Sequence, residues 1–214
     1  VTKDDQGLRR LLSEYYHRAV VELGQKTHKT PKGRLRTVVK VLQNIGIVEV
    51  VFVAPEGPHA IAGGLAQVIV GLTAALDRLG ISTTIVTPLY EEAQGNKHRA
   101  AEDVIRNGVE IAGRMVGLKE VGEVRIPIGP TFEAGSKRIR QCARIAVATV
   151  YLAESEGVRI FFLRHRRLAD KLYAPCGNDD QLRKSVFLSR GTLELIRDPQ
   201  FGINPHIVVT NDWL

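Results

Sequence analysis

Cysteine, aromatic residues and long apolar runs are all scarce in this sequence of 214 residues. The two cysteines, Cys142 and Cys176, are too few and too far apart to indicate a disulfide framework or a zinc site. They favour a reducing compartment, and no segment has the order of charges and apolar residues of a secretory signal, so we expect a cytoplasmic protein. No apolar run approaches the ~20 residues of a membrane-spanning helix, which argues against a membrane partner.

Acidic residues are outnumbered, and the excess positive charge is concentrated at one end of the chain. The formal net charge is +7, and residues 1–45 hold ten Lys and Arg against four Asp and Glu. A basic surface is compatible with nucleotide phosphates, nucleic acid and anionic lipid. Solvated side chains on helix faces explain the charge more simply, and no motif with interleaved aromatic residues accompanies it, so the sequence disfavours nucleic acid as a partner.

Residues 1–45 are predicted to form a basic helical appendage. Apolar residues recur at steps of three and four between Leu8 and Leu23, which is the period of a helix that packs one face. A polar, basic loop follows and leads to a second short helix at about residues 34–44. Docking to a polyanion or to a partner protein is one use that such an appendage could have.

A strand, a glycine turn, a helix and a second strand follow in that order. Residues 48–54 and 81–87 are nearly continuous apolar and β-branched sequence, as expected for strands covered on both faces. Gly63 and Gly64 open the helix between them, and Gly80 stands where a left-handed cap would end it. A right-handed crossover makes the two strands parallel. The predicted apolar stripe of the helix consists of Leu65, Val68, Ile69, Leu72, Leu76 and Leu79.

The rest of the chain completes an α/β domain, which we place at residues 46–214. Hairpin-like strands are predicted in the middle, then a helix at 182–197 and a last buried strand at 205–210. The β-prone runs in the middle are residues 109–115, 121–128, 143–151 and 158–163. The alternation of strands and helices predicts a Rossmann-like domain with a parallel sheet.

Two polar clusters follow predicted strands, at the edge where open parallel sheets bind ligands. The first runs from Glu56 to Gly64, and the second consists of Asn211, Asp212 and Trp213. Glycine lets the backbone approach a ligand closely and presents N–H groups at the positive end of a helix, for which phosphate is the natural guest. A pair of glycines can equally be a tight turn without a ligand.

Short motifs along residues 48–214 resemble, in order and spacing, those of bacterial glycogen synthases and plant starch synthases. The family pattern of Ser-Glu, Lys-Thr-Gly-Gly-Leu-Ala-Asp-Val, Leu-x-x-x-Gly and Val-x-Thr-Pro-x-Tyr is matched by Glu56 and by residues 63–68, 76–80 and 85–90. Later family motifs are matched by residues 157–165, 172–173, 180–181, 187–195, 205–208 and 211–213.

The resemblance implies a GT-B glycosyltransferase, in which two Rossmann-like domains face each other across a cleft. This chain would be the N-terminal domain, and the C-terminal domain that holds most of the donor would be missing from it, so the fragment alone would be inactive. The implied reaction transfers glucose from ADP-glucose or UDP-glucose to an α-1,4-glucan with retention at the anomeric carbon, without a metal or another cofactor. The donor nucleotide, the acceptor and the oligomeric state stay open.

The resemblance also assigns roles to individual residues. Gly63, Gly64 and Ile61, the last at the position of the family's Lys, would line the donor phosphates. Asp180 would be catalytic, holding sugar hydroxyls beside the reacting carbon, although it could also cap the following helix, and the two roles can coexist. The residues implied to bind the acceptor and sugar are Glu56, Tyr173, Gln181, Asn211, Asp212 and Trp213, of which Trp213 could instead be ordinary core.

The sequence departs from the family pattern at charged positions. Ile61 replaces a Lys, Gln67 replaces an Asp, and Asn211 replaces a His. Loss of a positioned charge near a transition state commonly costs two to three orders of magnitude in rate. A second hypothesis therefore stands beside the enzyme: a degenerate, non-catalytic synthase-like module that binds carbohydrate or serves as a scaffold.

Overall fold

The computed structural model describes residues 49–78, 80–94, 97–111, 113–131, 140–155, 157–172 and 178–211, without the side chains of 130, 131, 140–143, 178 and 179. The predicted appendage and the predicted site residues Tyr173, Asp212 and Trp213 lie outside the described residues. The elements are β1 (Glu49–Val53), α3 (Gly64–Asp77), β2 (Ser82–Leu89), α4 (Ala101–Asn107), β3 (Val109–Ile111), β4 (Arg114–Val116), β5 (Lys119–Thr131), β6 (Arg140–Ser155), β7 (Val158–Arg164), α5 (Asn178–Arg197), a 3₁₀ helix (Pro199–Phe201) and β8 (Ile207–Thr210).

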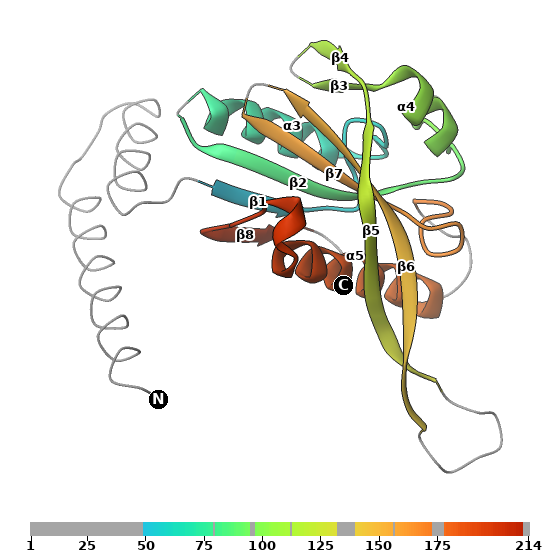
Figure 1. Ribbon diagram of the computed structural model, residues 1–214. Helices are drawn as coiled ribbons and strands as arrows, with labels where there is room; N and C mark the ends of the chain where they lie inside the picture. The colour runs from blue at the N-terminus through green and yellow to red at the C-terminus, as the bar shows by residue number, and fades with distance from the viewer. Residues whose placement is uncertain are drawn as a thin grey trace, which may run out of the picture. The chain divides into compact units, whose positions relative to one another are not determined.

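A six-stranded sheet in the order β5-β6-β7-β2-β1-β8 forms the centre of the fold (Figure 1). β1 pairs in parallel with β2 and with β8, and β2 pairs in parallel with β7. β5 and β6 extend the sheet as an antiparallel hairpin beside β7. The predicted mixed α/β fold with a mostly parallel sheet is therefore confirmed, and the carboxyl ends of β7, β2, β1 and β8 share one edge.

Helices on opposite sides of this sheet bury both faces of its central strands (Figure 1). Val51 and Val53 of β1 belong to a buried apolar cluster with Phe187 and Leu188 of α5. Successive strand residues point to opposite faces, so Val50 and Phe52, which are also buried, face α3. Burial on both faces explains why β1 and β2 have nearly continuous apolar and β-branched sequence.

α3 ends as the sequence predicts but packs through smaller residues. Gly80 has φ of +75°, its N–H donates to Asp77 O at 2.8 Å, and the next N–H donates to Leu76 O, which is a left-handed cap. The predicted apolar stripe is wrong at Val68 and Leu72, which are 62% and 42% exposed. The buried residues of the helix are Ala66, Ile69 and Thr73, because small side chains let the helix lie close to the sheet.

The strands predicted in the middle of the chain are present, and β5, β6 and β7 are longer than the β-prone runs indicated. The run at 109–115 is instead divided into the two short strands β3 and β4, which pair as a hairpin. β5 and β6 stay paired across three register shifts, between Glu120 and Gly122, between Pro127 and Pro130, and between Pro130 and Thr131. Bulges of this kind bend a strand without ending its pairing, and the sequence pattern breaks where they occur. Gly157, with φ of +80°, makes the tight turn from β6 into β7.

The prediction that residues 205–210 form a buried strand is wrong in its burial. Among the described strands, β8 pairs with β1 alone, and Val208 is 46% exposed. An edge strand has one neighbour only, so its apolar side chains remain partly open to solvent although their composition is that of a central strand.

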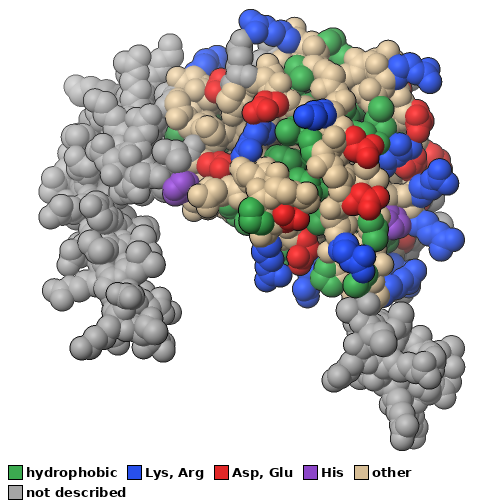
Figure 2. Space-filling view, in the orientation of Figure 1, with side chains coloured by type: hydrophobic (Ala, Val, Ile, Leu, Met, Phe, Trp, Pro, Cys, Tyr) green, Lys and Arg blue, Asp and Glu red, His purple; other side chains and the backbone are tan. Residues whose placement is uncertain are grey.

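Hydrophobic side chains also reach the surface between acidic and basic ones in the middle of the face shown in Figure 2. None of the helices in the described part is long and apolar enough to cross a membrane.

Candidate functional site

Glu56 occupies the N-terminus of α3 from inside the protein. Its side chain is 2% exposed. One carboxylate oxygen, Oε2, accepts hydrogen bonds from the backbone N–H groups of Ala62 (3.3 Å), Gly63 (3.0 Å) and Ala66 (3.4 Å). A carboxylate in this position satisfies N–H groups that have no partner within the helix and interacts favourably with the helix dipole. The turn after β1 is therefore held in shape by an anion of the chain itself.

A group of buried aromatic and histidine side chains packs beneath the turn between β1 and α3. His59 is fully buried and its Nε2 lies 2.9 Å from the Pro88 carbonyl oxygen, while Tyr90 donates its hydroxyl hydrogen to Pro55 O at 2.8 Å. The His59 ring stacks on Tyr90 and meets Phe162 edge-on. Burial lowers the pKa of His59 from 6.5 to about 3, so this ring is neutral at pH 7. These contacts fix the path of the chain between β1 and α3.

Gly63 and Gly64 present an open backbone at the carboxyl edge of the sheet. Both residues are exposed, and neither has the positive φ for which glycine is favoured. A Cβ atom added to Gly64 would meet nothing within 4 Å, and one added to Gly63 would make only an ordinary contact with Glu56 at 3.5 Å. The fold itself therefore does not require glycine at these two positions, and close approach by another molecule is the remaining physical reason for it.

The end of β8 lies beside the end of β1, as the sequence predicts. The Asn211 N–H donates to Val53 O at 2.9 Å. The side-chain nitrogen of Asn211 is buried and has no hydrogen-bond partner among the described residues. An unpaired buried donor is costly, and such groups occur most often where a ligand or water completes them. Asn211 thus brings an available donor to the edge that carries the glycine turn.

Asp180 and Gln181 lie in the first turn of α5, away from the glycine turn in the sequence and on an element that packs on the other face of the sheet. Because α5 begins at Asn178, Asp180 stands within the helix and not at its N-cap position. Its carboxylate lies 3.5 Å from Nζ of Lys184, a buried lysine that also contacts Asp170 at 2.6 Å. Burial alone would raise the pKa of Asp170, but the hydrogen bond from Lys184, hydrogen bonds from the backbone and the charge of Lys184 together outweigh it and lower this pKa.

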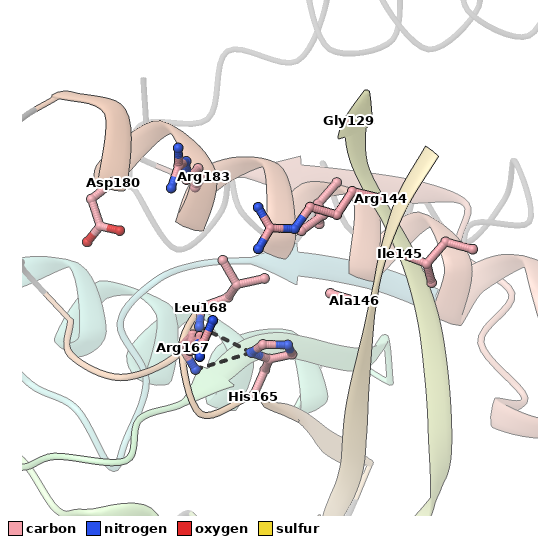
Figure 3. Close-up of a pocket in the computed structure, with 10 residues that line it drawn as sticks. Gly129, Arg144, Ile145, Ala146, His165, Arg167, Leu168, Asp180 and Arg183 are labelled. Atoms are coloured by element: carbon pink, nitrogen blue, oxygen red, sulfur yellow. Dashed lines mark hydrogen bonds between the residues drawn. The ribbon is translucent and has the colours of Figure 1, made fainter. Parts of the chain in front are cut away.

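A cavity of about 760 Å³ opens beside Asp180, between α5, the β5–β6 hairpin and the turn that follows β7 (Figure 3). His165 is the first residue after β7, and its Nδ1 accepts the backbone N–H groups of Arg167 and Leu168, each at 3.2 Å. The ring hydrogen is therefore on Nε2. Burial lowers the pKa of His165, which keeps the ring neutral. The sequence pattern did not predict this cavity. The residues that line it are Ile128, Gly129, Arg144, Ile145, Ala146, His165, Arg167, Leu168, Asp180 and Arg183.

Ile61 and Gln67, two of the positions that depart from the family pattern, line a second cavity together. It has a volume of about 410 Å³ and lies between α3 and the β3–β4 hairpin. Its other lining residues include Pro58 and Val70, so its wall is largely apolar. The two positions at which the resemblance implies a cation and an anion are thus neighbours in space, and both charges are absent from the same place.

The structure groups the predicted site residues in two sets along one edge. Glu56, Ile61, Gly63 and Gly64 surround the start of α3, with Asn211 on the neighbouring edge strand, while Asp180 and Gln181 start α5. Neither cavity described above is lined by residues from both sets. In the described part of the chain, no group of three His, Cys, Asp or Glu side chains is placed to hold a metal ion.

Comparison with known proteins finds one family along most of the chain. The sequence model described as the starch synthase catalytic domain matches residues 49–214. A glycogen synthase of Geotalea uraniireducens is 29% identical over 169 residues, which cover 78% of this chain and 29% of that protein. A glycogen synthase of Syntrophotalea carbinolica is 28% identical over 160 residues, which cover 73% of this chain and 26% of that protein.

A solved structure has the same fold. The catalytic domain of starch synthase IV from Arabidopsis thaliana, bound to ADP and acarbose, is 25% identical and superimposes with a TM-score of 0.53. The match covers 78% of this chain and 28% of that one. The matched segments make up 29%, 26% and 28% of the lengths of these three relatives. The chain therefore spans less than a third of each of them.

Proposed function

This chain belongs to the starch synthase catalytic domain family, and we propose from that premise that the protein containing it is a retaining glycosyltransferase. It transfers glucose from ADP-glucose or UDP-glucose to an α-1,4-glucan. This domain forms one wall of the cleft, and a second domain completes the donor site. The proposal is supported by the glycogen synthases and the starch synthase among its relatives, and by ADP and acarbose in the solved structure.

The observation that carries the proposal is the open glycine turn at the carboxyl edge of a parallel sheet. Gly63 and Gly64 are exposed, and a Cβ atom would fit at either position without a clash. They begin a helix whose positive end points outward. Ala62, Gly63 and Ala66 already donate to Glu56. Hence Gly64 and the residue after it supply the N–H groups that remain available for a phosphate oxygen.

Each part of this edge has a role in the proposed transfer. The bond from the anomeric carbon to the diphosphate breaks, so negative charge grows on the departing phosphate. A glucan hydroxyl oxygen bonds to the anomeric carbon, and its proton is taken up by the departing diphosphate. The backbone amide of Gly64 meets that charge without a metal, in a position fixed before the substrate arrives. Asn211 supplies a hydrogen-bond donor to a sugar oxygen. Asp180 accepts sugar hydroxyls and is oriented by Lys184.

Glucosyl transfer by the full-length protein tests the proposal, with ADP-glucose and UDP-glucose as donors and glycogen as acceptor. Gly64→Ala should lower kcat/KM about tenfold or more, because a methyl group blocks close approach, while the unfolding midpoint stays within the error of the wild type. Gly117→Ala is the matched control, since a Cβ there also meets open space but lies far along the chain from the edge. Equal activity of both variants would remove the glycine turn from the donor site.

Two further measurements divide the proposal into parts. Glucosyl transfer that survives Asp180→Ala unchanged would remove Asp180 from the catalytic residues. The 214-residue chain alone should give no turnover because the second domain is needed, and measurable turnover would refute that need.

The second cavity favours a second candidate function. Ile61 and Gln67 in its wall supply neither of the charges that the resemblance implies at their positions, which suits a non-catalytic module that binds α-glucan, and Glu110 adds a carboxylate to the same lining. The two candidates differ in a direct comparison: the module binds a maltooligosaccharide with the same affinity in the presence and absence of ADP-glucose and releases no ADP, whereas the enzyme releases ADP in step with glucan growth.

A further inference from the structure

Three arginines from three separate elements line the larger cavity. Arg144 belongs to β6, Arg167 to the turn after β7, and Arg183 to α5. Side chains alternate between the two faces of β6, so Arg144 and Ala146 lie on the same face. Ala146 is buried and paired with Ile126, which places this face on the α5 side of the hairpin. The side chain of Arg144 is therefore directed toward α5. Figure 3 shows Arg144 reaching into the space between α5 and the turn that carries Arg167.

The described residues do not balance the positive charge of these three arginines. Within the described part of the chain, no side chain or backbone group pairs with the guanidinium of Arg144, Arg167 or Arg183. Among the described lining residues Asp180 is the one carboxylate, and it lies 3.5 Å from the ammonium group of Lys184. All three arginines are exposed, so their guanidinium groups remain accessible to a ligand of opposite charge.

The other lining residues give the cavity further selectivity. His165 is neutral and carries its hydrogen on Nε2, because Nδ1 accepts two backbone N–H groups. It therefore offers a donor and adds no charge. Ile128, Ile145 and Leu168 supply apolar wall. A cavity of about 760 Å³ is within the range that holds a complete small molecule rather than a single ion.

We propose that this cavity binds a small phosphate ester, with its phosphate held by Arg144, Arg167 and Arg183 and its body against His165 and the apolar wall. Guanidinium groups pair with phosphate oxygens through two parallel hydrogen bonds, which fits arginine better than lysine in this role. The site is separate from the proposed donor turn at Gly63 and Gly64, which lies at the start of α3. A sugar phosphate and a nucleotide share the chemistry that this site recognises.

Calorimetric titration of the 214-residue chain at about 0.15 M salt tests the proposal, with inorganic phosphate, a hexose monophosphate, a nucleoside diphosphate and an uncharged hexose as probes. We expect one ester to bind at one site with Kd below about 1 mM, more tightly than inorganic phosphate, and the uncharged hexose not to bind. The tighter of the two esters identifies the source of the phosphate.

Matched arginine variants localise the binding. Arg144→Gln, Arg167→Gln and Arg183→Gln should each weaken ester binding about fivefold or more. Arg125→Gln removes the same charge from an exposed arginine next to Val124 and Ile126 in β5, on the opposite face of the hairpin, and should leave binding unchanged. Circular dichroism checks that all four variants fold. No ester binding, or equal weakening in Arg125→Gln, would overturn the proposal.

A second readout follows the ligand at His165 itself. Arg167 and Arg144 help to lower the pKa of this ring, after the larger effect of its burial. A bound phosphate offsets their charge, so the His165 pKa measured by NMR should rise when the ester is added and should not rise in Arg144→Gln. An unchanged His165 pKa at saturating ester would refute the placement. Asp180 lines this cavity and also has a role in the proposed transfer. Ester binding is measured on the 214-residue chain without glucosyl transfer, so either proposal can fail while the other stands.

Discussion

The buried ring of His59 makes the stability of this domain depend on pH in a way that can be calculated. Its Nε2 faces the Pro88 carbonyl oxygen, which can only accept, so the hydrogen is on Nε2 and Nδ1 is unprotonated. Nδ1 is buried without a hydrogen-bond partner among the described residues. Protonation of Nδ1 would place a positive charge in the core, which is why the pKa falls from 6.5 to about 3.

The sign and size of the effect follow from these two values. Below pH 6.5 the unfolded chain takes up a proton at His59 and the folded chain does not until about pH 3, so acid favours unfolding over this window. The loss is about 1.4 kcal/mol for each pH unit inside the window. Between pH 7 and pH 5, His59 alone should remove about 2 kcal/mol from the free energy of unfolding.

Urea unfolding of the 214-residue chain at a series of pH values measures this loss. His59→Gln keeps a donor for Pro88 and has no proton to gain, so its stability should fall by about 2 kcal/mol less than that of the wild type between pH 7 and pH 5. His206→Gln replaces an exposed histidine and should follow the wild type. Parallel pH profiles of the wild type and His59→Gln would refute the assignment of the proton to this ring.

Three other substitutions test the packing of the fold by the same unfolding measurement. Gly191→Ala in α5 should destabilise by about 1–2 kcal/mol, because its Cβ would lie 2.6 Å from Leu163 Cδ1 and 2.9 Å from Ile126 Cδ1. Gly71→Ala in α3, where a Cβ meets open space, should instead stabilise by about 0.5–1 kcal/mol. If Gly191→Ala and Gly71→Ala changed the free energy of unfolding in the same direction, this account would be contradicted. Lys184→Met should cost about 2–3 kcal/mol by leaving Asp170 without its buried partner, whereas a neutral result would show that the pair is dispensable.

The sequence predicted the parts of the fold that depend on local pattern and on covering of both sheet faces. β1 and β2 were predictable because α3 and α5 bury both faces, which leaves a continuous apolar run in the sequence. Gly80 was predictable because a left-handed residue at a helix end strongly favours glycine. Each of these signals lies within a few residues of the element that it specifies.

Features that depend on distant neighbours were not predictable in this way. The composition of β8 is that of a central strand, and nothing within its sequence indicates that it has a single neighbour. The stripe of α3 was wrong at Val68 and Leu72 because apolar spacing does not reveal which residues allow the closest approach to the sheet. The bends of the β5–β6 hairpin likewise depend on pairing between the two strands.

In the candidate site, too, the features that follow from local sequence were predictable and those that depend on distant contacts were not. The glycine turn and the end of β8 could be placed at one edge, because residues after parallel strands meet there. The contact of Glu56 with the start of α3 and the three arginines around the larger cavity could not, because their partners come from separate elements. Tyr173, Asp212 and Trp213 remain predictions from the resemblance.

The carboxylate of Glu56 makes the start of α3 a rigid rim before any substrate is present. Its three hydrogen bonds immobilise the backbone of residues 62–66 as the domain folds, so the conformational entropy of this segment is already lost when a ligand arrives. If the proposed donor site lies here, a sugar nucleotide that binds to it meets a surface that need not rearrange. Its association should therefore be fast and limited by encounter rather than by loop closure.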